Sequence, residues 1–326
     1  MKLLGKVTLI VLCVLLAVVL LVLGGLNLLK FAIYADYYAV KTDVCKNPGV
    51  SDGFICQGIC ADEGSGKIFV SGYMKDGSAS RIYVTDTEDR SYFVSLSYGS
   101  GKEYTAHSGG IAVAGEFAYV ASGGKLYQVP VASLLAAKNG ETVKISKIVP
   151  VNNEASFVYA DGTYLYVGEF HDGGSYVTNH PYDTPEGQNH AIVSRYAVKD
   201  ITAYHKTEHP TVNPDKIYSI RNKVQGICFA PDGTVLLSTS YGLADTVYYA
   251  YREADAVDSG EKLDGAPVYF FGSCTMEIKG PAMGEDLDFY DGKFLTLTES
   301  ASDKYIFGKF FFADRIVALE LSGNEE

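Results

Sequence analysis

The sequence contains no tryptophan, and its basic residues are scarce. Only 27 Lys and Arg stand against 39 Asp and Glu, which gives a formal net charge of −12. No Lys- or Arg-rich run occurs, and binding to nucleic-acid phosphates requires clustered basic side chains. We therefore exclude nucleic acid as a partner. Acidity of this size indicates solubility and attraction of cations rather than a specific function.

Motifs for several common active sites are also absent. The chain has no Gly-x-Ser-x-Gly nucleophile motif, and the Gly-Ser-Gly at 99–101 lacks the spacing and the following Ser or Thr of a phosphate-binding loop. Cys and His residues never show the spacing of a structural zinc site. No motif by itself therefore assigns an activity to this chain.

Cysteine is rare, and the number of cysteines after residue 35 is odd. The five are Cys45, Cys56, Cys60, Cys228 and Cys274, so an exported domain would keep at least one free thiol. Cys45 and Cys56 are close enough in sequence to bridge in an oxidising compartment. Cys60 and Cys228 each follow Gly-Ile, and we interpret both as small core residues.

Charge is missing altogether from residues 7–29, a run of 23 residues. About 20 apolar residues span a bilayer as a helix, and this run exceeds the 7–15 residues of a usual secretory signal. We predict an uncleaved transmembrane anchor, although Ile33-Tyr34-Ala35 offers a weak cleavage site. Lys2 and Lys6 favour a cytoplasmic N-terminus at 1–6. The protein is then single-pass in the cell membrane, with its remaining domain outside the cytoplasm.

A repeat organises the rest of the chain. Gln57-Gly-Ile-Cys60 returns unchanged as Gln225-Gly-Ile-Cys228, and looser copies begin near residues 107, 154 and 285. Each copy begins a set of short apolar runs separated by Gly, Asp and Ser, which is the pattern of β-strands joined by turns. Steps of 47–71 residues between copies approach the 40–50 of propeller blades. The sequence predicts an all-β propeller over 57–326.

Five blades of four antiparallel strands account for the copies, with six as the alternative. The fifth copy has room for three strands only, at 285–289, 294–298 and 315–321. We expect residues 37–40, inside the linker at 30–56, to supply its fourth strand and close the ring. For the fourth copy we predict strands at 225–229, 235–240, 246–252 and 268–272. Residues 132–139 predict a helical turn.

Polar residues that open the first strand of each blade are the candidates for a ligand site, because first strands line the channel of a propeller. Gln57, Glu154, Gln225 and Glu285 align, and His107 lies two residues before the aligned position in the second copy. The ends of the second strands add further candidates on the same face. The predicted ligand-binding residues are Gln57, His107, Glu154, Glu169, Gln225, Tyr241, Glu285 and Glu299.

Chemistry at this mouth is an alternative to binding. Carboxylates in pairs serve as general acid and base in glycoside hydrolysis, or bind Ca²⁺ or another divalent cation. Glu154, Glu285 and His107 are the catalytic candidates. Three of the six histidines fall in the long loop at 169–190, and imidazole with carboxylate suits metals such as zinc. Glu154, Glu285 and His171 are the metal-ligand candidates.

The segment Gln225-Gly-Ile-Cys-Phe-Ala-Pro-Asp-Gly-Thr-Val-Leu-Leu-Ser-Thr-Ser240 resembles the blades of extracellular propellers of the gluconolactonase-like, strictosidine-synthase-like and paraoxonase-like group. The resemblance concerns the plan of the blade. It implies six blades and an axial divalent cation held by Glu, Asn and Asp, with Glu154 and Glu285 in such roles. Asn is missing from the aligned positions, although Asn152 and Asn153 precede Glu154.

Two functions follow from these observations. The first is a membrane-anchored extracellular propeller that binds a small molecule, a glycan or a protein at its channel mouth. The second is a divalent-metal-assisted hydrolase, similar to a lactonase, an esterase or a glycosidase, that uses the channel carboxylates and His107. Because no catalytic motif is present, we favour binding.

Overall fold

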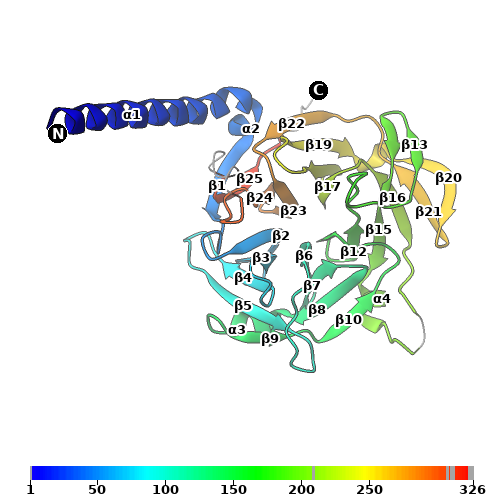
Figure 1. Ribbon diagram of the computed structural model, residues 1–326. Coiled ribbons are helices and arrows are strands. Elements are labelled where there is room, and N and C mark those ends of the chain that lie inside the picture. Colours follow the sequence, from blue (N-terminus) through cyan, green and yellow to red (C-terminus); the bar gives the residue numbers. More distant parts are fainter. Residues whose placement is uncertain (1, 208–209, 306–307, 309–312, 322–326) are drawn as a thin grey trace.

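The structure is a computed structural model that describes residues 2–207, 210–305, 308 and 313–321. Within these residues, five β-sheets surround a common centre like the blades of a propeller, and one long helix projects from the edge of the ring (Figure 1). The prediction of an all-β, five-bladed propeller preceded by an apolar helix is confirmed.

The first two blades form from short apolar runs that are separated by turns with Gly, Asp or Ser. In blade one the strands are β2 (Phe54–Asp62), β3 (Lys67–Met74), β4 (Arg81–Thr85) and β5 (Tyr92–Ser97), with β9 (Thr142–Lys144) added in parallel to β5. In blade two they are β6 (Gly110–Ala114), β7 (Phe117–Ser122), β8 (Lys125–Pro130) and β10 (Lys147–Pro150). The predicted helical turn is α3 (Val131–Ala136).

Blade three is the widest sheet in the described part. Its strands are β11 (Phe157–Ala160), β12 (Tyr164–Gly168), β15 (Ala191–Ala197) and β16 (Lys216–Ile220), extended by β21 (Ala266–Phe270) and β20 (Val257–Leu263). The long loop after β12 contains a hairpin of β13 (Tyr182–Thr184) and β14 (Gly187–Asn189), and the helix α4 (Val198–Ala203) follows β15.

Blades four and five complete the ring. Blade four consists of β17 (Val224–Phe229), β18 (Thr234–Thr239), β19 (Thr246–Arg252) and β22 (Met276–Gly280), with the 3₁₀ turn η1 (Glu253–Asp255) after β19. Blade five consists of β23 (Gly284–Tyr290), β24 (Lys293–Thr298), β25 (Arg315–Leu319) and β1 (Lys41–Lys46).

The fourth strand of blade four was placed wrongly at 268–272. That apolar run forms β21, which pairs in parallel with β16 of blade three. The outer strand of blade four is β22, which pairs antiparallel with β19. Both runs have strand character, and only the tertiary pairing distinguishes which blade each one joins.

An N-terminal strand closes the ring as predicted, but residues 37–40 do not form it. They belong to the helix α2 (Ala35–Val40), and the next six residues form β1, antiparallel to β25. The ring of Tyr37 packs parallel to that of Tyr248, with 6.2 Å between centroids, and lies over Gly280 of β22. This contact favours a helix at residues 35–40. The sequence did not reveal it, because the periodicity of so short an apolar run fits a helix and a strand equally well.

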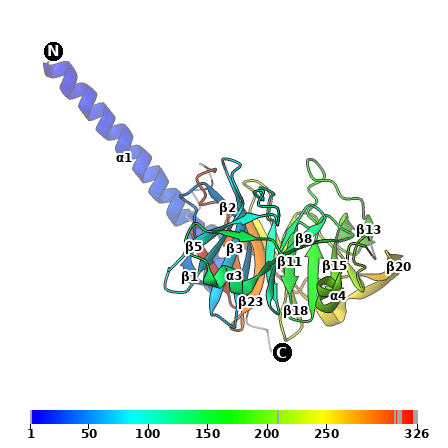
Figure 2. The same cartoon turned by 90° about the horizontal axis from the view of Figure 1, so that it is seen from below.

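The helix α1 (Lys2–Ile33) precedes the propeller, and its segment Gly5–Ile33 is long and apolar enough to cross a membrane or to act as a signal sequence. It is longer than the predicted span at 7–29, and its last turns take up the first part of the predicted linker. None of its apolar window is buried against the domain. Seen edge-on, α1 leaves the disc obliquely at one edge (Figure 2).

The core lies between neighbouring blades. Cys60 and Cys228 are buried in it, as predicted, at equivalent places in blades one and four. Cys45 and Cys56 are free thiols in the structure, and Cys56 Sγ lies 3.1 Å from Asn47 Nδ2 instead of bonding to a second sulfur.

Candidate functional site

The innermost strands of neighbouring blades approach each other closely around the channel. A Cβ atom added to Gly58 would lie 2.6 Å from the Cα of Gly110, and one added to Gly226 would lie 2.7 Å from the Cα of Asp286. Glycine allows this close approach of neighbouring strands. The inner strands of neighbouring blades are therefore packed tightly against each other at this level.

β-Bulges direct three side chains toward that end. The register between β2 and β3 shifts between Cys56 and Gly58, which leaves Gln57 as the extra residue. A matching shift occurs at Gln225 in β17 and around Glu285 in β23. Bulges re-aim side chains and are frequent beside binding sites. The Gln-Gly-Ile-Cys repeat thus marks a repeated bulge.

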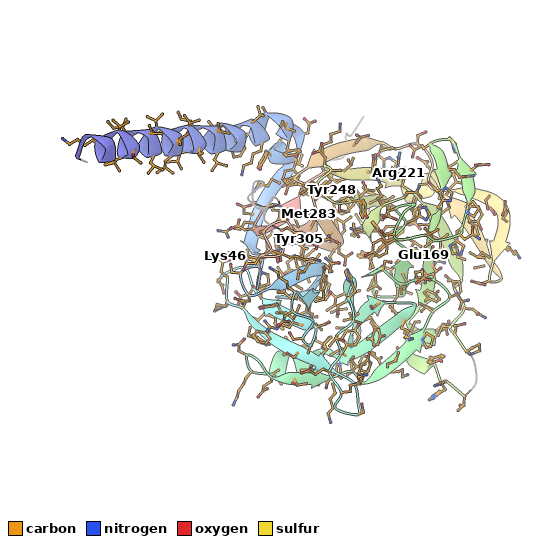
Figure 3. The ribbon with its side chains drawn as sticks, viewed as in Figure 1. Lys46, Glu169, Arg221, Tyr248, Met283 and Tyr305 are labelled. Carbon is orange, nitrogen blue, oxygen red and sulfur yellow. The ribbon has the colours of Figure 1, made fainter. Side chains whose placement is uncertain are left out.

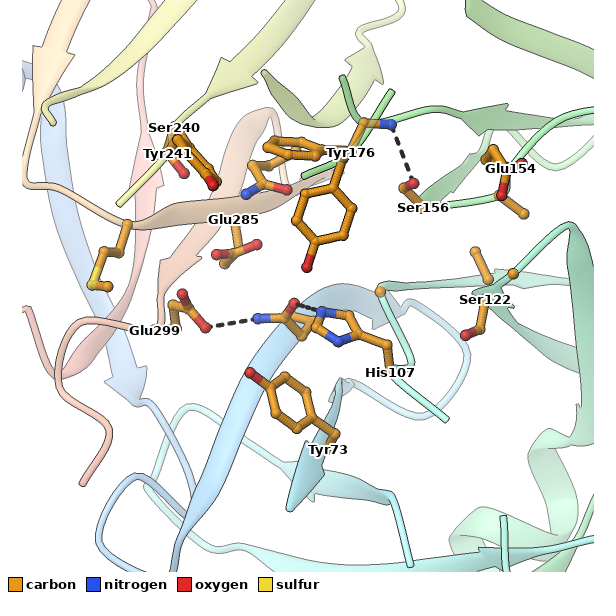
Figure 4. A pocket seen from close by; sticks show the side chains of 18 of the residues that line it. Tyr73, His107, Ser122, Glu154, Ser156, Tyr176, Ser240, Tyr241, Glu285 and Glu299 are labelled. Atoms are coloured by element: carbon orange, nitrogen blue, oxygen red, sulfur yellow. Dashed lines mark hydrogen bonds between the residues drawn. The ribbon is translucent and has the colours of Figure 1, made fainter. Parts of the chain in front are cut away.

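A cavity of about 630 Å³ opens above these bulges. This volume lies in the range of small-molecule sites. Tyr73, Tyr176 and the carboxyls of Glu285 and Glu299 surround the same space (Figure 4). The other described side chains that line it, apart from glycines and alanines, are Gln57, His107, Ser122, Glu154, Ser156, Phe170, Gln225, Ser240, Tyr241, Met283, Lys304 and Tyr305.

Gln57 connects two of the lining groups. Its Nε2 donates to the Cys56 carbonyl at 2.8 Å and to Glu299 Oε2 at 2.9 Å. This orientation turns Oε1 toward His107 Nε2, with which it is hydrogen-bonded, so His107 carries its proton on Nε2. The imidazole stacks on Tyr73, with ring centroids 4.5 Å apart.

His107 is neutral at physiological pH. Enclosure by protein atoms in the cavity, together with the nearby Lys304 ammonium, lowers its pKa from 6.5 to about 4. Desolvation penalises the imidazolium, and a like charge adds to that effect. The ring therefore offers a hydrogen-bond acceptor at Nδ1 and an aromatic face, but no positive charge.

Glu285 and Glu299 form a pair of buried carboxyls with strongly perturbed ionisation. Burial is the main cause for both: it raises the pKa of Glu299 to about 7 and that of Glu285 well above its usual range. The negative charge of Glu299, then that of Asp286, raises the pKa of Glu285 further. Two carboxyls that are buried close together hold a proton at pH values where isolated ones would be ionised.

The two carboxyls differ in their hydrogen bonds. Glu299 Oε2 accepts from Gln57 and, at 3.2 Å, from the Tyr305 hydroxyl, which leaves Oε1 for a proton. Glu285 is only 3% exposed, yet no described residue hydrogen-bonds to its side chain. A buried carboxyl without a partner carries a desolvation cost that a ligand can remove.

Aromatic rings form much of the remaining wall. Phe170 lies 5.4 Å from Tyr176 and 5.9 Å from Tyr241, measured between ring centroids. Lys304 Nζ lies 4.8 Å above the ring of Tyr73 and 5.0 Å above that of Tyr305, so these faces already accept a cation. Met283 and Tyr305 lie on the side of blade five (Figure 3).

The structure brings together most of the predicted ligand-binding residues. Those that line the cavity are Gln57, His107, Glu154, Gln225, Tyr241, Glu285 and Glu299. Glu154 does not align with Gln57 as predicted. A Cβ on Gly109 would lie 1.9 Å from the Ser156 carbonyl oxygen, so Ser156 is the residue of blade three that lies beside Gly109 of blade two. Glu154 precedes Ser156 by two residues, just as His107 precedes Gly109.

Glu169 lies behind the cavity wall and has a structural role. It is 1% exposed and accepts hydrogen bonds from His180 Nδ1 at 2.8 Å and from the Ile192 amide at 3.2 Å. The hydrogen bond to Glu169 raises the pKa of His180. These contacts fix the long loop after β12 to blade three. Glu169 lies across the disc from Lys46 at the edge of blade five (Figure 3).

His171 does not line the cavity with Glu154 and Glu285. It is buried in the long loop, where its Nδ1 accepts from the Thr178 amide at 3.0 Å and its ring stacks on His190 at 4.8 Å. No group of three or more His, Cys, Asp or Glu side chains in the described residues is arranged to hold a metal ion. A metal held by Glu154, Glu285 and His171 stays a prediction from the sequence.

Sequence reasoning missed Tyr73, Tyr176, Lys304 and Tyr305. The signal for Tyr73 was present, since Tyr73 and Tyr241 occupy equivalent places in the two copies of the Gln-Gly-Ile-Cys repeat. Tyr176, Lys304 and Tyr305 lie in loops that belong to a single blade each, so no repeat identifies them. Their position depends on how those loops fold back over the mouth.

No protein-family model and no curated protein matches this sequence. Among solved structures, the chain is similar to the PQQ-bound form of aldose sugar dehydrogenase from Streptomyces coelicolor, with 15% identity, coverage of 79% of this chain and 77% of that chain, and a TM-score of 0.41. A putative oxidoreductase (glucose dehydrogenase) from Thermus thermophilus has 13% identity, coverage of 86% and 99%, and a TM-score of 0.40.

Hydrazine synthase from Kuenenia stuttgartiensis is a further match, with 11% identity, coverage of 76% of this chain and a TM-score of 0.38. The chain spans only 56% of that protein. Likenesses this distant carry no conclusion about activity. The fold itself confirms the blade-level resemblance to propellers that the sequence indicated.

Proposed function

We propose that this protein is a membrane-anchored binding protein whose central cavity takes a small organic cation, with a primary, secondary or quaternary amine as the recognised group. Glu285 is the observation that carries the proposal. Its carboxyl is buried, lines the cavity and has no partner in the described residues. An ammonium group would place a positive charge beside this carboxyl, with N–H hydrogen bonds to it where the amine is primary or secondary, and would favour the ionised form of the pair.

The surrounding wall supports the same ligand class. Glu154 and Glu299 add carboxyls to the lining, whereas Lys304 is the one positively charged side chain among its described residues. The rings of Tyr176 and Tyr241 can cover the methyl or methylene groups next to an ammonium, an arrangement worth about 0.5–2 kcal/mol per ring contact. The cavity, with a volume of about 630 Å³, also has room for more than the ammonium group alone.

A hydrolase is less well supported than a binding protein. Among the described residues, His107 forms a hydrogen bond with the Gln57 side-chain amide through Nε2. No Ser, Thr or Cys in this part of the chain is hydrogen-bonded to His107. A neutral histidine held by an amide lacks an adjacent nucleophile to activate. For the anchor, Lys2 and Lys6 favour an N-terminus inside the cell and the propeller outside it.

Binding of amines to the full-length protein in lipid nanodiscs tests the proposal. Choline, putrescine, spermidine and benzyltrimethylammonium are titrated by calorimetry, with 3,3-dimethyl-1-butanol as the neutral isostere of choline. We expect at least one amine to bind, and choline to bind at least about tenfold more tightly than its isostere, a difference of about 1.4 kcal/mol. Absence of binding by every amine, or equal binding of choline and the isostere, would contradict the proposal.

A further inference from the structure

The connection between α1 and the propeller is too short to act as a flexible tether. α1 ends at Ile33, and α2 begins at Ala35. Tyr34 between them is 5% exposed, and Tyr37 is 3% exposed against blade four. A domain joined in this way cannot move away from the membrane that holds the helix. With α1 anchored in a bilayer, the point where it meets the edge of the disc (Figure 2) would lie close to the membrane surface.

This junction lies on the rim that surrounds the cavity mouth. The Tyr34 hydroxyl donates to Asp245 Oδ1 at 2.8 Å. Asp245 belongs to the loop between β18 and β19, and Ser240 and Tyr241 at the start of the same loop line the cavity. The end of the anchor and one wall of the cavity are thus joined through one short segment.

Exposed apolar side chains concentrate on the same rim. Tyr176 and Val177 in the loop after β12 are 54% and 68% exposed, and Tyr241 and Leu243 in the loop after β18 are 42% and 55% exposed. The two loops meet where Phe170 contacts both tyrosine rings. The other exposed large apolar residues described outside α1 are isolated ones elsewhere on the propeller: Leu135, Ile148 and Val257.

We propose that these two loops, which we call the mouth loops (residues 172–179 and 240–245), insert their apolar side chains into the interfacial layer of the bilayer that α1 spans. The inference rests on the proposed anchoring by α1. Transfer of the Val177 and Leu243 side chains out of water would stabilise the docked orientation, because burial of apolar surface is favourable. Tyrosine suits the interface because its ring is apolar and its hydroxyl polar.

Docking places the cavity next to the lipid headgroups. A ligand that partitions into the membrane surface then reaches Glu285 and Glu299 without first entering bulk solvent. The mouth loops would therefore contact the lipid surface itself. The anchor holds them beside the bilayer, so no partner protein has to be recruited.

The absence of tryptophan from the chain makes the inference directly measurable. Single tryptophans are introduced as Val177→Trp and Leu243→Trp, with Val257→Trp as the matched exposed control on β20 and Leu20→Trp as the reporter for α1. Each full-length variant is placed in phosphatidylcholine nanodiscs with brominated or ordinary acyl chains. We expect bromine to reduce the emission of Val177→Trp and Leu243→Trp at least about twofold, with a blue shift, and to leave Val257→Trp unchanged.

The reporters separate anchoring from docking. If bromine fails to quench Leu20→Trp, anchoring by α1 is wrong. If it quenches Leu20→Trp but neither Val177→Trp nor Leu243→Trp, anchoring stands and docking of the mouth loops is overturned. Equal quenching of Val257→Trp also overturns docking, because the propeller then touches the membrane without a preferred face.

Discussion

Glu285→Gln is expected to weaken amine binding by about 10- to 100-fold and, in the same protein, to raise stability at pH 8. Glutamine keeps the size of the side chain but removes the charge that pairs with the ammonium, and a hydrogen bond from a primary or secondary ammonium to a carboxylate contributes about 1.5–3 kcal/mol. Without ligand, the substitution removes a buried, unpartnered carboxyl and its repulsion with Glu299, for a gain of about 1–3 kcal/mol. Calorimetry and thermal unfolding measure the two effects.

Asp288→Asn is the matched control. Asp288 is buried on the same strand, and burial raises its pKa to about 7, but it does not line the cavity and accepts from the Ala61 amide at 2.7 Å. We expect this substitution to alter the pH dependence of stability and to leave amine affinity unchanged. An equal loss of affinity in both variants would show that binding depends on the charge of the whole strand rather than on Glu285.

Stability of the unliganded protein should fall as pH rises through 7. Glu299 has its pKa raised from 4.5 to about 7, so its contribution is fully present below pH 4.5 and is lost as pH rises through about 7. The shift corresponds to at most about 3 kcal/mol. His107 opposes this: its lowered pKa gives a contribution that is present above pH 6.5 and is lost as pH falls through about 4.

Comparison of the wild type with Glu299→Gln separates the contribution of Glu299 to the pH dependence of stability from that of His107. Unfolding free energies of both proteins are measured at pH 5 and pH 8 by the near-ultraviolet circular dichroism of tyrosine. We expect the wild type to lose more stability than the variant over this interval, by about 1–3 kcal/mol. Parallel pH profiles would mean that Glu299 ionises normally in the folded protein.

Much of the fold followed from local patterns. The repeated Gln-Gly-Ile-Cys segments located the inner strands of blades one and four, since alternation of apolar residues and turn glycines is a local property. Residues 37–40 and 268–272 were assigned wrongly because both are short apolar runs whose state depends on what they pack against. Residues 37–40 form a helix because Tyr37 packs on Tyr248 and Gly280. Residues 268–270 join blade three because they pair with the edge of β16.

The candidate site was predictable to the extent that it derives from the repeats. The positions of Gln57, Gln225 and Glu285 follow from their alignment, and the bulges that direct them inward are the reason the alignment is informative. His171 was grouped with Glu154 and Glu285 because of its residue type and because its long loop was expected on the same face, and in the structure its ring stacks on that of His190. The absence of a partner for Glu285 among the described residues has no signature in the sequence, because it depends on which side chains fail to reach it.

Proton release on ligand binding tests the central claim most directly. The claim is that the Glu285–Glu299 pair holds a proton in the empty cavity and gives it up when an organic cation binds. Choline, or the tightest amine of the panel, is titrated at pH 6 in two buffers with different ionisation enthalpies. We predict release of up to about one proton per ligand, and affinity that increases as pH rises toward 8. Binding without proton release, at an affinity that does not change from pH 5 to pH 8, would contradict the account.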